Sequence, residues 1–360
     1  MARDVRWGIL SCGKISADFV KAMSVTESVC TAYAVAARSK ASAQKFAELH
    51  GIEKVHESYE ALVNDPDIDV VYIGSVADTH YKLAKMCLEA KKPTLVEKPL
   101  ALNYDEAKLL VDLAREQDVF FMEGMWSRFF PAMKKARSIV DSGGIGDIVC
   151  VQGDFGWNTK DCKPDDRMWN PLSGGMSYDI AMYLAMLGQV GYRGATVKNV
   201  HAVCPNKRNG MDQTILANVF FNKPDDSVGS LQMFVTGQAN TEERTMIQGT
   251  KGRITITPPA HTPSNISVNY DIGRGESRQD FHDYPLPDDS WAQWNYPRSI
   301  GFAYQIQEVN ECIRNDLKES EHFTLDDSLQ LAFIMDEILE QIGHEGWMED
   351  KEKRNAAKSA

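Results

Sequence analysis

The chain of 360 residues lacks the features of secreted and membrane proteins. It has no apolar run that approaches the roughly 20 residues a membrane-spanning helix needs. Its N-terminal stretch, MARDVRWGIL, carries charges where a signal peptide has its apolar centre. These two absences predict a cytoplasmic protein that has no membrane partner.

Cysteine and histidine are scattered along the chain without the spacing of a metal site. The seven cysteines form no CxxC or CxxxC pair, and the eight histidines form no HxxxH or HExxH pattern. A zinc site or a disulfide framework needs such spacings. We therefore expect no metal ion, and the odd cysteine count is typical of a reducing compartment.

A positively charged stripe is also missing. The formal net charge is −12, and acidic and basic residues alternate along the chain instead of forming blocks. Nucleic acid is therefore not an expected partner. The anionic groups of a cofactor would have to be bound by a few local cations or by backbone amides.

What is present is a pattern of short apolar runs that alternate with amphipathic stretches over residues 1–125. The expected strands are Val5–Leu10, Val29–Ala37, Val70–Gly74, Thr94–Val96 and Val119–Met122. The expected helices are Ile15–Met23, Ala41–Leu49, 79–90 and one that Asn103 caps, with Glu106 in the position of a capping box. Such alternation predicts an α/β domain of the Rossmann type, a doubly wound parallel sheet covered on both faces.

The pattern changes over residues 126–348, where strands follow one another with few helices between them. The expected strands are Val149–Trp157, Val197–Cys204, Thr214–Phe221, Val228–Val235, Thr245–Gln248, Arg253–Thr257 and Ile266–Tyr270. The expected helices are 131–141, Tyr178–Leu187, Phe302–Ile313 and Leu325–Ile342. The residues GTKG at 249–252 indicate a tight hairpin. We expect a long loop at 273–298 and a disordered tail at 349–360. We predict a second, α+β domain with a mostly antiparallel, open-faced sheet.

The first strand-to-helix turn resembles a dinucleotide-binding fingerprint only in part. Of the glycines in GxGxxG, the middle one remains, as Gly13. It allows the backbone to approach a pyrophosphate, and the helix that follows offers amides and a favourable dipole. The expected cofactor-binding residues of this turn are Ser11, Cys12, Gly13, Lys14 and Ile15. A turn that binds no ligand is the equally weighted alternative.

Arg38, Ser39 and Lys40 follow the second expected strand. An NAD enzyme usually has Asp or Glu at this point, where it accepts hydrogen bonds from the ribose hydroxyls. Arg38 cannot accept such a bond, but its planar guanidinium suits a 2′-phosphate. The segment therefore predicts NADP rather than NAD, with a solvated basic loop as the alternative.

Two further motifs carry groups that can move a proton. Glu97-Lys98-Pro99 follows the fourth expected strand, at the edge of the sheet where ligands bind in this fold. Asp179 and Tyr183 are four residues apart, so they share one face of a predicted helix behind the glycine pair at 174–175. Alternatively, the tripeptide is ordinary surface, and the tyrosine and aspartate are a packing pair.

Taken in order along the chain, these motifs resemble the glucose–fructose oxidoreductase/inositol dehydrogenase (Gfo/Idh/MocA) family. The resemblance covers residues 4–345 and rests on the first turn, Thr79-His80, Glu97-Lys98-Pro99, the Asp179–Tyr183 helix and GTKG. Within the family, MEGMWSRFFP at 122–131 and DFG at 154–156 are similar to the branch that acts on trans-dihydrodiols and, with NADP, on D-xylose. Tyr183 in place of the more common His departs from the inositol dehydrogenases.

The resemblance implies roles for particular residues. Lys98 and Tyr183 would form the catalytic pair, and Asp179 would position the substrate. The other implied site residues are Trp126, Arg128 and Phe155 near the nicotinamide and the substrate, and Ser75, Val76, His80 and Glu97 in the cofactor cleft. A core or capping role for His80 is the alternative. The resemblance also implies a homodimer that pairs through the C-terminal sheet.

The expected reaction is hydride transfer between NADP and a CH–OH group of a cyclic sugar or diol. A phenol has an ordinary pKa of about 10, so Tyr183 needs a nearby cation to act as the base. The leading types are D-xylose 1-dehydrogenase and trans-1,2-dihydrobenzene-1,2-diol dehydrogenase. An NADPH-dependent sugar or keto-sugar reductase and a non-catalytic NADP-binding redox sensor are the alternatives. Lys98, Asp179 and Tyr183 together count against the sensor, which needs no base.

Overall fold

The computed structural model describes residues 4–359, which divide into two compact units. The first unit runs to Phe130 and adds Leu286–Leu329. The second consists of Pro131–Pro285 and continues from Gln330. The sequence predicted two continuous domains that meet at residues 125 and 126, whereas in the structure a late segment returns to the first unit. The helix within this late segment packs against the first unit, where the Trp7 indole nitrogen donates a buried hydrogen bond to Asn310 Oδ1 at 2.9 Å.

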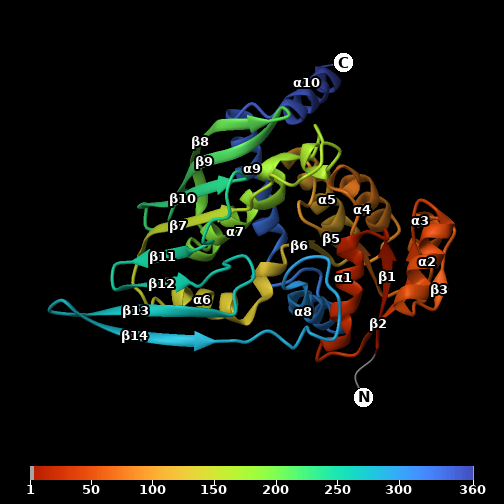
Figure 1. Ribbon diagram of the computed structural model, residues 1–360, viewed down its shortest axis with the longest axis horizontal. Helices are drawn as coiled ribbons and strands as arrows, with labels where there is room; N and C mark the ends of the chain where they lie inside the picture. The colour runs from red at the N-terminus through yellow and green to blue at the C-terminus, as the bar shows by residue number, and fades with distance from the viewer. Residues whose placement is uncertain (1–3, 360) are drawn as a thin grey trace. The chain divides into compact units, whose positions relative to one another are not determined.

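The first unit is built on a six-stranded parallel sheet (Figure 1). Its strands are β1 (Val5–Leu10), β2 (Cys30–Ala36), β3 (Lys54–Val55), β4 (Val70–Ile73), β5 (Thr94–Glu97) and β6 (Phe121–Gly124). They lie in the order β3-β2-β1-β4-β5-β6, so the direction of chain progression reverses between β1 and β4. This order confirms the predicted Rossmann fold, and the reversal is the point at which such sheets bind ligands.

Six helices accompany this sheet. They are α1 (Lys14–Ala22), α2 (Lys40–His50), α3 (Tyr59–Val63), α4 (His80–Glu89), α5 (Tyr104–Gln117) and α8 (Phe302–Arg314). The predicted cap of α5 is confirmed, since Asn103 Oδ1 accepts a 2.9 Å hydrogen bond from the amide of Glu106. The short elements β3 and α3 escaped the sequence analysis because two and five residues are too few to show a period.

The second unit contains an eight-stranded sheet. Its strands are β7 (Ile148–Gly156), β8 (Thr196–Arg208), β9 (Met211–Asn222), β10 (Val228–Thr236), β11 (Thr245–Gly249), β12 (Gly252–Ile256), β13 (Asn265–Gly273) and β14 (Glu276–Asp283). The order is β14-β13-β12-β11-β7-β10-β9-β8, with β7 and β10 parallel and the other neighbours antiparallel. The mostly antiparallel α+β architecture is therefore confirmed, as is the hairpin at 249–252, where Gly249 pairs with Gly252.

Helices α6 (Pro131–Asp141) and α7 (Met182–Gly191) pack on one face of this sheet. Every residue of α7 is buried. Burial alternates along β9 and β10, so that Leu216, Gln232 and Phe234 lie exposed on the opposite face. The chain ends with α9 (Leu325–Gln341) and α10 (Glu345–Ser359). Within residues 4–359 no helix is long and apolar enough to cross a lipid bilayer.

Two expectations about irregular segments were wrong. The predicted loop at 273–298 contains β14, an edge strand that pairs with β13 although polar residues stand on both of its faces. The predicted disordered tail from residue 349 is helical to Ser359. Trp347 is buried there, and its indole nitrogen donates to Asp336 Oδ1 on α9 at 2.9 Å. This contact with another helix is not visible in the charged composition of the tail.

Candidate active site

The predicted cofactor-binding residues gather at one edge of the parallel sheet. Because all six strands run in the same direction, the segments that follow them emerge at the same edge. Ser11 to Gly13 follow β1, Arg38 follows β2, Ser75 follows β4, and Lys98 follows β5. The first unit therefore brings together residues that are far apart in the sequence.

The turn after β1 is shaped to accept an anionic group. Ser11 stands where the fingerprint has its first glycine, and it adopts a positive φ of 88°. Gly13 begins α1, and an added Cβ there would lie 3.7 Å from the nearest atom, the Gly74 oxygen. In the described chain no side chain caps this helix start, and no acidic residue lies in its first turn. The amides and the dipole of α1 are thus available to a pyrophosphate.

Cys12 and Ser16 complete this turn. Burial raises the pKa of the Cys12 thiol to about 11, so the side chain stays neutral beside the anion that the turn would bind. Ser16 is fully buried, and an added Cβ at Gly74 would lie only 2.4 Å from its Oγ. A small residue at position 16 therefore lets α1 approach the end of β4 closely.

Of the three polar residues after β2, two are engaged in local structure. The Ser39 hydroxyl accepts the Ser42 amide at 3.4 Å and caps α2, while Lys40 forms an ion pair with Glu57. Arg38 is exposed and close to Tyr59, whose pKa is raised by burial and lowered in part by the arginine charge. The expectation of a 2′-phosphate site depends mainly on Arg38.

His80 links the two segments that follow β4 and β5. Its Nδ1 lies 2.7 Å from the Pro99 oxygen, and its Nε2 lies 3.2 Å from the Ser75 oxygen. The ring is 1% exposed, and burial lowers its pKa. This geometry supports the core role for His80. The Thr79 hydroxyl also donates a hydrogen bond to Ser75 Oγ at 2.7 Å. The neighbouring Val76 is exposed.

Two buried carboxyl groups lie near Lys98. Glu97 accepts a 2.9 Å hydrogen bond from the Tyr72 hydroxyl, and Glu123 Oε1 accepts the Leu100 amide at 3.0 Å. Burial raises the pKa of each to about 7, and the Lys98 charge opposes that rise. Glu97 is thus engaged within the unit by Tyr72. Glu123 was missed by sequence reasoning, since its carboxylate looks like that of any strand residue.

Trp126 and Arg128 pack against the segment that returns to the first unit. The Trp126 ring stacks on Phe302 with centroids 4.4 Å apart. Arg128 is 2% exposed, and its Nε donates to the His322 oxygen at 3.1 Å. Its guanidinium also lies 3.7 Å from Asp327. These contacts give both residues a structural role, whatever they contact in a complex.

Phe155, Asp179 and Tyr183 all belong to the second unit. Ser177–Ala181 is a π-helical segment that leads into α7, and such segments are frequent at functional sites. The Tyr183 and Phe155 rings lie with centroids 5.8 Å apart. Asp179 forms a 2.8 Å ion pair with Arg167, a residue that sequence reasoning missed because no motif surrounds it.

The glycine pair before this segment is explained by contact with other protein elements. Gly175 has a φ of 89°, and an added Cβ would lie 2.2 Å from Asp212 Oδ1. The buried Asp212 carboxylate accepts both the amide and the hydroxyl of Ser177 at 2.8 Å. At Gly175 the close approach is therefore made by Asp212 of β9, which fixes the start of the helix.

A histidine that sequence reasoning missed lies beside the two aromatic residues. His261 stacks on Phe155 with a centroid distance of 4.7 Å and lies 5.5 Å from the Tyr183 ring. Its Nδ1 is 2.6 Å from Glu243 Oε2. The prolines around it, in PPAHTP at 258–263, were the only local signal of an ordered loop.

Family models match both units of the chain. The model described as an oxidoreductase family with an NAD-binding Rossmann fold matches residues 5–125. The model of the GFO/IDH/MocA C-terminal domain matches residues 133–255. The first unit is therefore an NAD(P)-binding Rossmann domain.

Curated relatives match over almost the full length. The trans-1,2-dihydrobenzene-1,2-diol dehydrogenase of Sus scrofa is 34% identical over 341 residues, which cover 94% of this chain and 97% of the relative. The enzyme of the same name from Homo sapiens is 33% identical over 342 residues, with the same coverage.

Solved structures share the fold at lower identity. Levoglucosan dehydrogenase in complex with NADH and levoglucosan has a TM-score of 0.77 at 20% identity and covers 95% of this chain and 98% of its own. A mutant 3-ketoreductase from Actinomadura kijaniata, in complex with TDP-benzene and NADP, has a TM-score of 0.72 at 22% identity, with 94% and 98% covered. The likeness to these structures is one of fold.

The buried carboxyl of Glu97 predicts a pH-dependent cost to stability. Its pKa in the folded protein is about 7 against an ordinary value of 4.5. The folded state therefore binds this proton more tightly, and the stability that it contributes is present below pH 4.5 and is lost as the pH rises through 7. In Glu97→Gln the amide oxygen can still accept from Tyr72, and we expect the fall in the free energy of unfolding over this interval to shrink by up to about 3 kcal/mol.

Urea unfolding of the wild type and Glu97→Gln at several pH values measures this difference. Glu89→Gln, a change on the exposed surface of α4, is the matched control and should leave the pH dependence as it is. Parallel pH profiles for the wild type and Glu97→Gln would contradict the assigned pKa.

Proposed function

The chain belongs to the Gfo/Idh/MocA family of oxidoreductases, and from that premise we propose that it transfers hydride between NADP and a CH–OH group of a cyclic sugar or diol. An oxidoreductase that acts on sugar or diol alcohols is the coarser conclusion. The finer proposal is an enzyme of the D-xylose 1-dehydrogenase or trans-1,2-dihydrobenzene-1,2-diol dehydrogenase type. The near-full-length similarity to the latter enzymes carries this proposal. A cytoplasmic location stays a prediction from the sequence.

The first unit would hold the cofactor through the edge of its parallel sheet. The amides at the start of α1, from Gly13 onward, would bind the pyrophosphate, because no side chain of the described residues caps this helix start and the dipole favours an anion there. Arg38 would bind the 2′-phosphate through its guanidinium fork. When bound, the nicotinamide supplies the carbon that exchanges a hydride with the substrate. Ser75, Val76, Glu97 and Trp126 remain proposed as neighbours of the cofactor.

The proposed proton transfer uses a phenol and a cation. Tyr183 would exchange a proton with the substrate hydroxyl, and Lys98 would favour the phenolate by its positive charge. The Lys98 charge opposes the rise that burial causes in the pKa of the Glu97 and Glu123 carboxyl groups, so the lysine and these carboxyl groups interact electrostatically. Asp179 would orient a second substrate hydroxyl, in exchange for its contact with Arg167.

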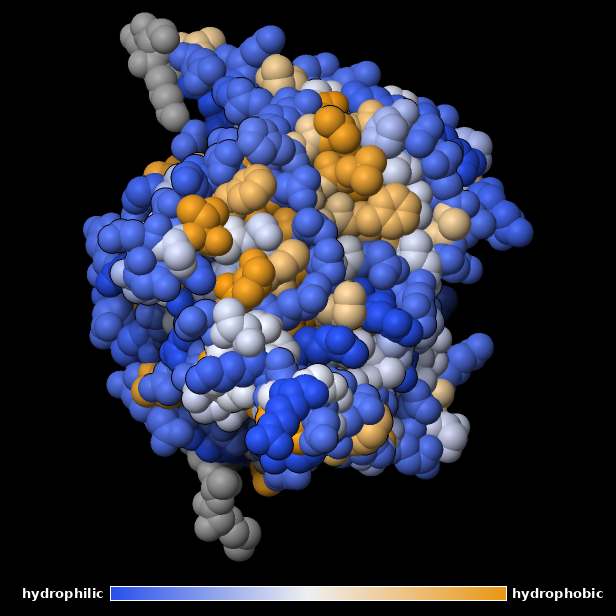
Figure 2. Space-filling view, turned by 90° about the vertical axis from the view of Figure 1, so that its left-hand side faces the viewer, coloured by the Kyte–Doolittle hydropathy of each residue, from blue (hydrophilic) through white to orange (hydrophobic). Residues whose placement is uncertain are grey.

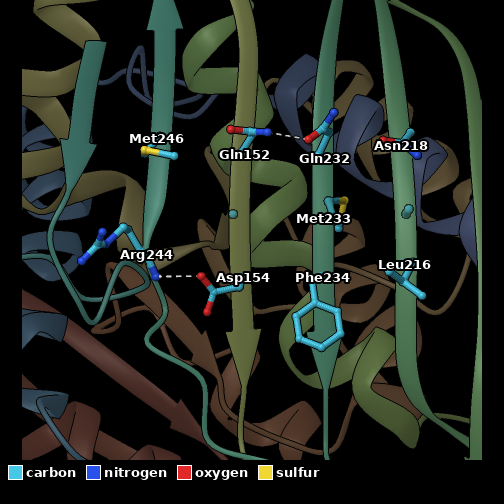
Figure 3. Close-up of a pocket in the computed structure, with 11 residues that line it drawn as sticks. Gln152, Asp154, Leu216, Asn218, Gln232, Met233, Phe234, Arg244 and Met246 are labelled. Carbon is cyan, nitrogen blue, oxygen red and sulfur yellow. Dashed lines mark hydrogen bonds between the residues drawn. The ribbon is translucent and has the colours of Figure 1, made fainter.

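We also propose that a second copy of the chain covers the exposed face of the eight-stranded sheet. A depression of about 410 Å³ lies on this face, between β11 and β9. The Gln152 amide donates to Gln232 Oε1 at 2.6 Å (Figure 3), and its own oxygen accepts from Gln248 Nε2 at 2.7 Å, so that the three glutamines form a ladder. Leu216 and Phe234 lie opposite each other beside it, 44% and 39% exposed. Figure 2 shows apolar side chains gathered in patches among hydrophilic ones.

A second copy fits this face because its groups are self-complementary. Each glutamine amide both donates and accepts, so a two-fold axis can bring like residues together. Exposed apolar side chains that adjoin one another commonly mark a protein interface.

Tyr183→Phe and Lys98→Met should each lower kcat by about 10² or more, since each removes a group that takes part in proton transfer. The measurement is NADPH absorbance with D-xylose and with trans-1,2-dihydrobenzene-1,2-diol, together with NADPH binding, which should persist. Tyr33→Phe and Lys108→Met, on the surface, are the controls. Near-normal turnover in both variants would remove the proposed roles.

Assaying both directions also separates the candidate activities. Faster reduction of sugars or keto-sugars by NADPH would favour a reductase. Tight NADPH binding without turnover in either direction would favour a redox sensor.

Arg38→Asp should shift cofactor preference from NADP toward NAD by about tenfold or more, because the new carboxylate repels a 2′-phosphate and accepts from ribose hydroxyls. The ratio of kcat/KM for NADP and NAD measures the shift. Arg193→Asp, an exposed arginine of the second unit, is the control. An unchanged ratio would mean that the 2′-phosphate is bound elsewhere.

Phe234→Asp should convert the homodimer to monomers, because a charge would be buried in the centre of the interface. Analytical ultracentrifugation over a range of protein concentrations measures the mass. Leu49→Asp, which changes an exposed apolar residue of α2, should leave the dimer intact. A wild type that sediments as a monomer at all concentrations would refute the proposed pairing.

A further inference from the structure

The C-terminal helix begins against the part of the second unit that leads into α7. His344, the residue before α10, is 2% exposed, and its Nε2 lies 3.2 Å from the Gly174 oxygen. Its ring also meets the Tyr178 ring edge to face, with centroids 5.3 Å apart. Gly346 allows this approach, since an added Cβ would collide with the Pro171 oxygen. The first turn of α10 therefore packs on the chain just before the π-helical segment.

The hydrogen bonds of His344 decide which of its ring nitrogens carries the hydrogen. The Trp347 amide lies 3.3 Å from Nδ1, and because a backbone amide can only donate, Nδ1 is the acceptor. The neutral ring then carries its hydrogen on Nε2, which faces the Gly174 oxygen. Asp212 Oδ1 is farther from Nε2, at 4.0 Å. One imidazole thus caps the start of α10 and donates to Gly174.

The glycine pair before the π-helical segment is anchored at both of its ends by buried groups. On one side, His344 binds the Gly174 oxygen. On the other, Asp212 accepts both the amide and the hydroxyl of Ser177 at 2.8 Å. Gly175, between these anchors, has a φ of 89°. Because glycine has the most conformational freedom to lose on folding, a pair of glycines depends on such anchors to keep one geometry.

Capping alone does not account for a buried histidine at this position. A helix start needs only an acceptor, and serine, asparagine or aspartate supplies one with a shorter side chain. Withdrawing an imidazole from water costs free energy unless its polar atoms find partners inside the protein. In His344 the second nitrogen finds that partner on a different element, the loop before the π-helical segment. The residue therefore joins two elements, and capping explains only one of its bonds.

We propose that His344 is a positioning residue for the reaction, which acts through the Gly174 carbonyl to hold Asp179 in its substrate-binding geometry. The inference rests on the proposed function, because it takes Asp179 to orient a substrate hydroxyl. Asp179 lies in the π-helical segment that follows the glycine pair, so a shift of that pair moves its carboxylate. A misplacement of about 1 Å in an orienting group can cost about 10²-fold in rate. Through His344, α10 contributes to substrate binding without touching the substrate.

Two substitutions separate the two hydrogen bonds of the ring. In His344→Gln the amide nitrogen takes the place of Nε2 and can still donate to Gly174, but the acceptor for Trp347 is lost. In His344→Asn the amide oxygen takes the place of Nδ1 and can still cap α10, but the donor to Gly174 is lost. The positioning role predicts impaired substrate binding in His344→Asn, whereas a capping role predicts the larger defect in His344→Gln.

Kinetics of the two variants provide the first readout, with D-xylose and with trans-1,2-dihydrobenzene-1,2-diol. We expect His344→Asn to raise KM about tenfold and to lower kcat by less than about threefold, because a group that binds the substrate is loosened. His344→Gln should keep KM within about threefold of the wild type. NADPH affinity should persist in both variants, since the cofactor is assigned to the first unit. His201→Asn and His201→Gln, at an exposed position on β8, are the matched controls and should leave KM unchanged.

Hydrogen exchange followed by mass spectrometry provides a second readout that needs no turnover. The amides of 175–183 should exchange faster in His344→Asn than in the wild type, because the anchor at Gly174 is lost. The amides of 345–349 should exchange faster in His344→Gln, because the cap of α10 is lost. Faster exchange at both places in both variants would mean a general loss of packing and would contradict the positioning role.

The outcomes separate this inference from the function on which it rests. An unchanged KM in His344→Asn, with turnover still lost in Tyr183→Phe, would overturn the role of His344 and leave the proposed function in place. A rise of KM in His344→Gln as large as that in His344→Asn would overturn it as well. A wild type that turns over neither substrate would overturn the function. Exchange would then decide whether His344 holds the segment, since an unchanged rate over 175–183 in His344→Asn refutes it.

Discussion

Parallel pairing within the first sheet is the constraint on which the cofactor site depends. β1 pairs with β2 on one side and with β4 on the other, both in parallel register. The segments after these strands therefore leave the sheet at one edge and diverge at the reversal of strand order. The start of α1, the Arg38 segment and the loop of Ser75 are neighbours for this reason, although their local sequences share no pattern.

Burial sets the electrostatics beside Lys98. The sheet withdraws Glu97 and Glu123 from water and raises the pKa of each to about 7. The free-energy cost of burying these carboxylate charges is offset by the Lys98 charge, by the hydrogen bond from the Tyr72 hydroxyl and by the one from the Leu100 amide. The same burial keeps Cys12 neutral.

In the second unit, α7 packs closely on the sheet, and its residue Tyr183 contacts side chains from two other segments. Gly153 allows this approach, since an added Cβ would lie 2.8 Å from the Leu184 side chain on α7. Tyr183, the residue before Leu184, then lies beside Phe155 and His261. The polar partner of this cluster is Glu243, whose position depends on Asp154 in β7. One strand thus places both an aromatic ring and the carboxylate that orients the histidine.

The sequence by itself determined the architecture of the two units. Alternation of apolar strands and amphipathic helices predicted the Rossmann unit, and the cap at Asn103 and the hairpin at 249–252 were visible in local motifs. These features depend on hydrogen bonds and burial within a few residues, which is what a sequence pattern records. The motifs around Gly13, Lys98 and Tyr183 were selected in the same way.

Only the tertiary structure decided which distant side chains meet. It engaged Asp179 with Arg167, linked His80 to the oxygens of Pro99 and Ser75, and placed His261 against Phe155. It also paired β14, whose polar sequence carries no strand period, and joined α10 to α9 through the hydrogen bond from the Trp347 indole nitrogen to Asp336. Such contacts follow from strand register and from the close approach of helices to sheets. Those are properties of the folded chain, because different secondary-structure elements and loops supply the two sides of these contacts.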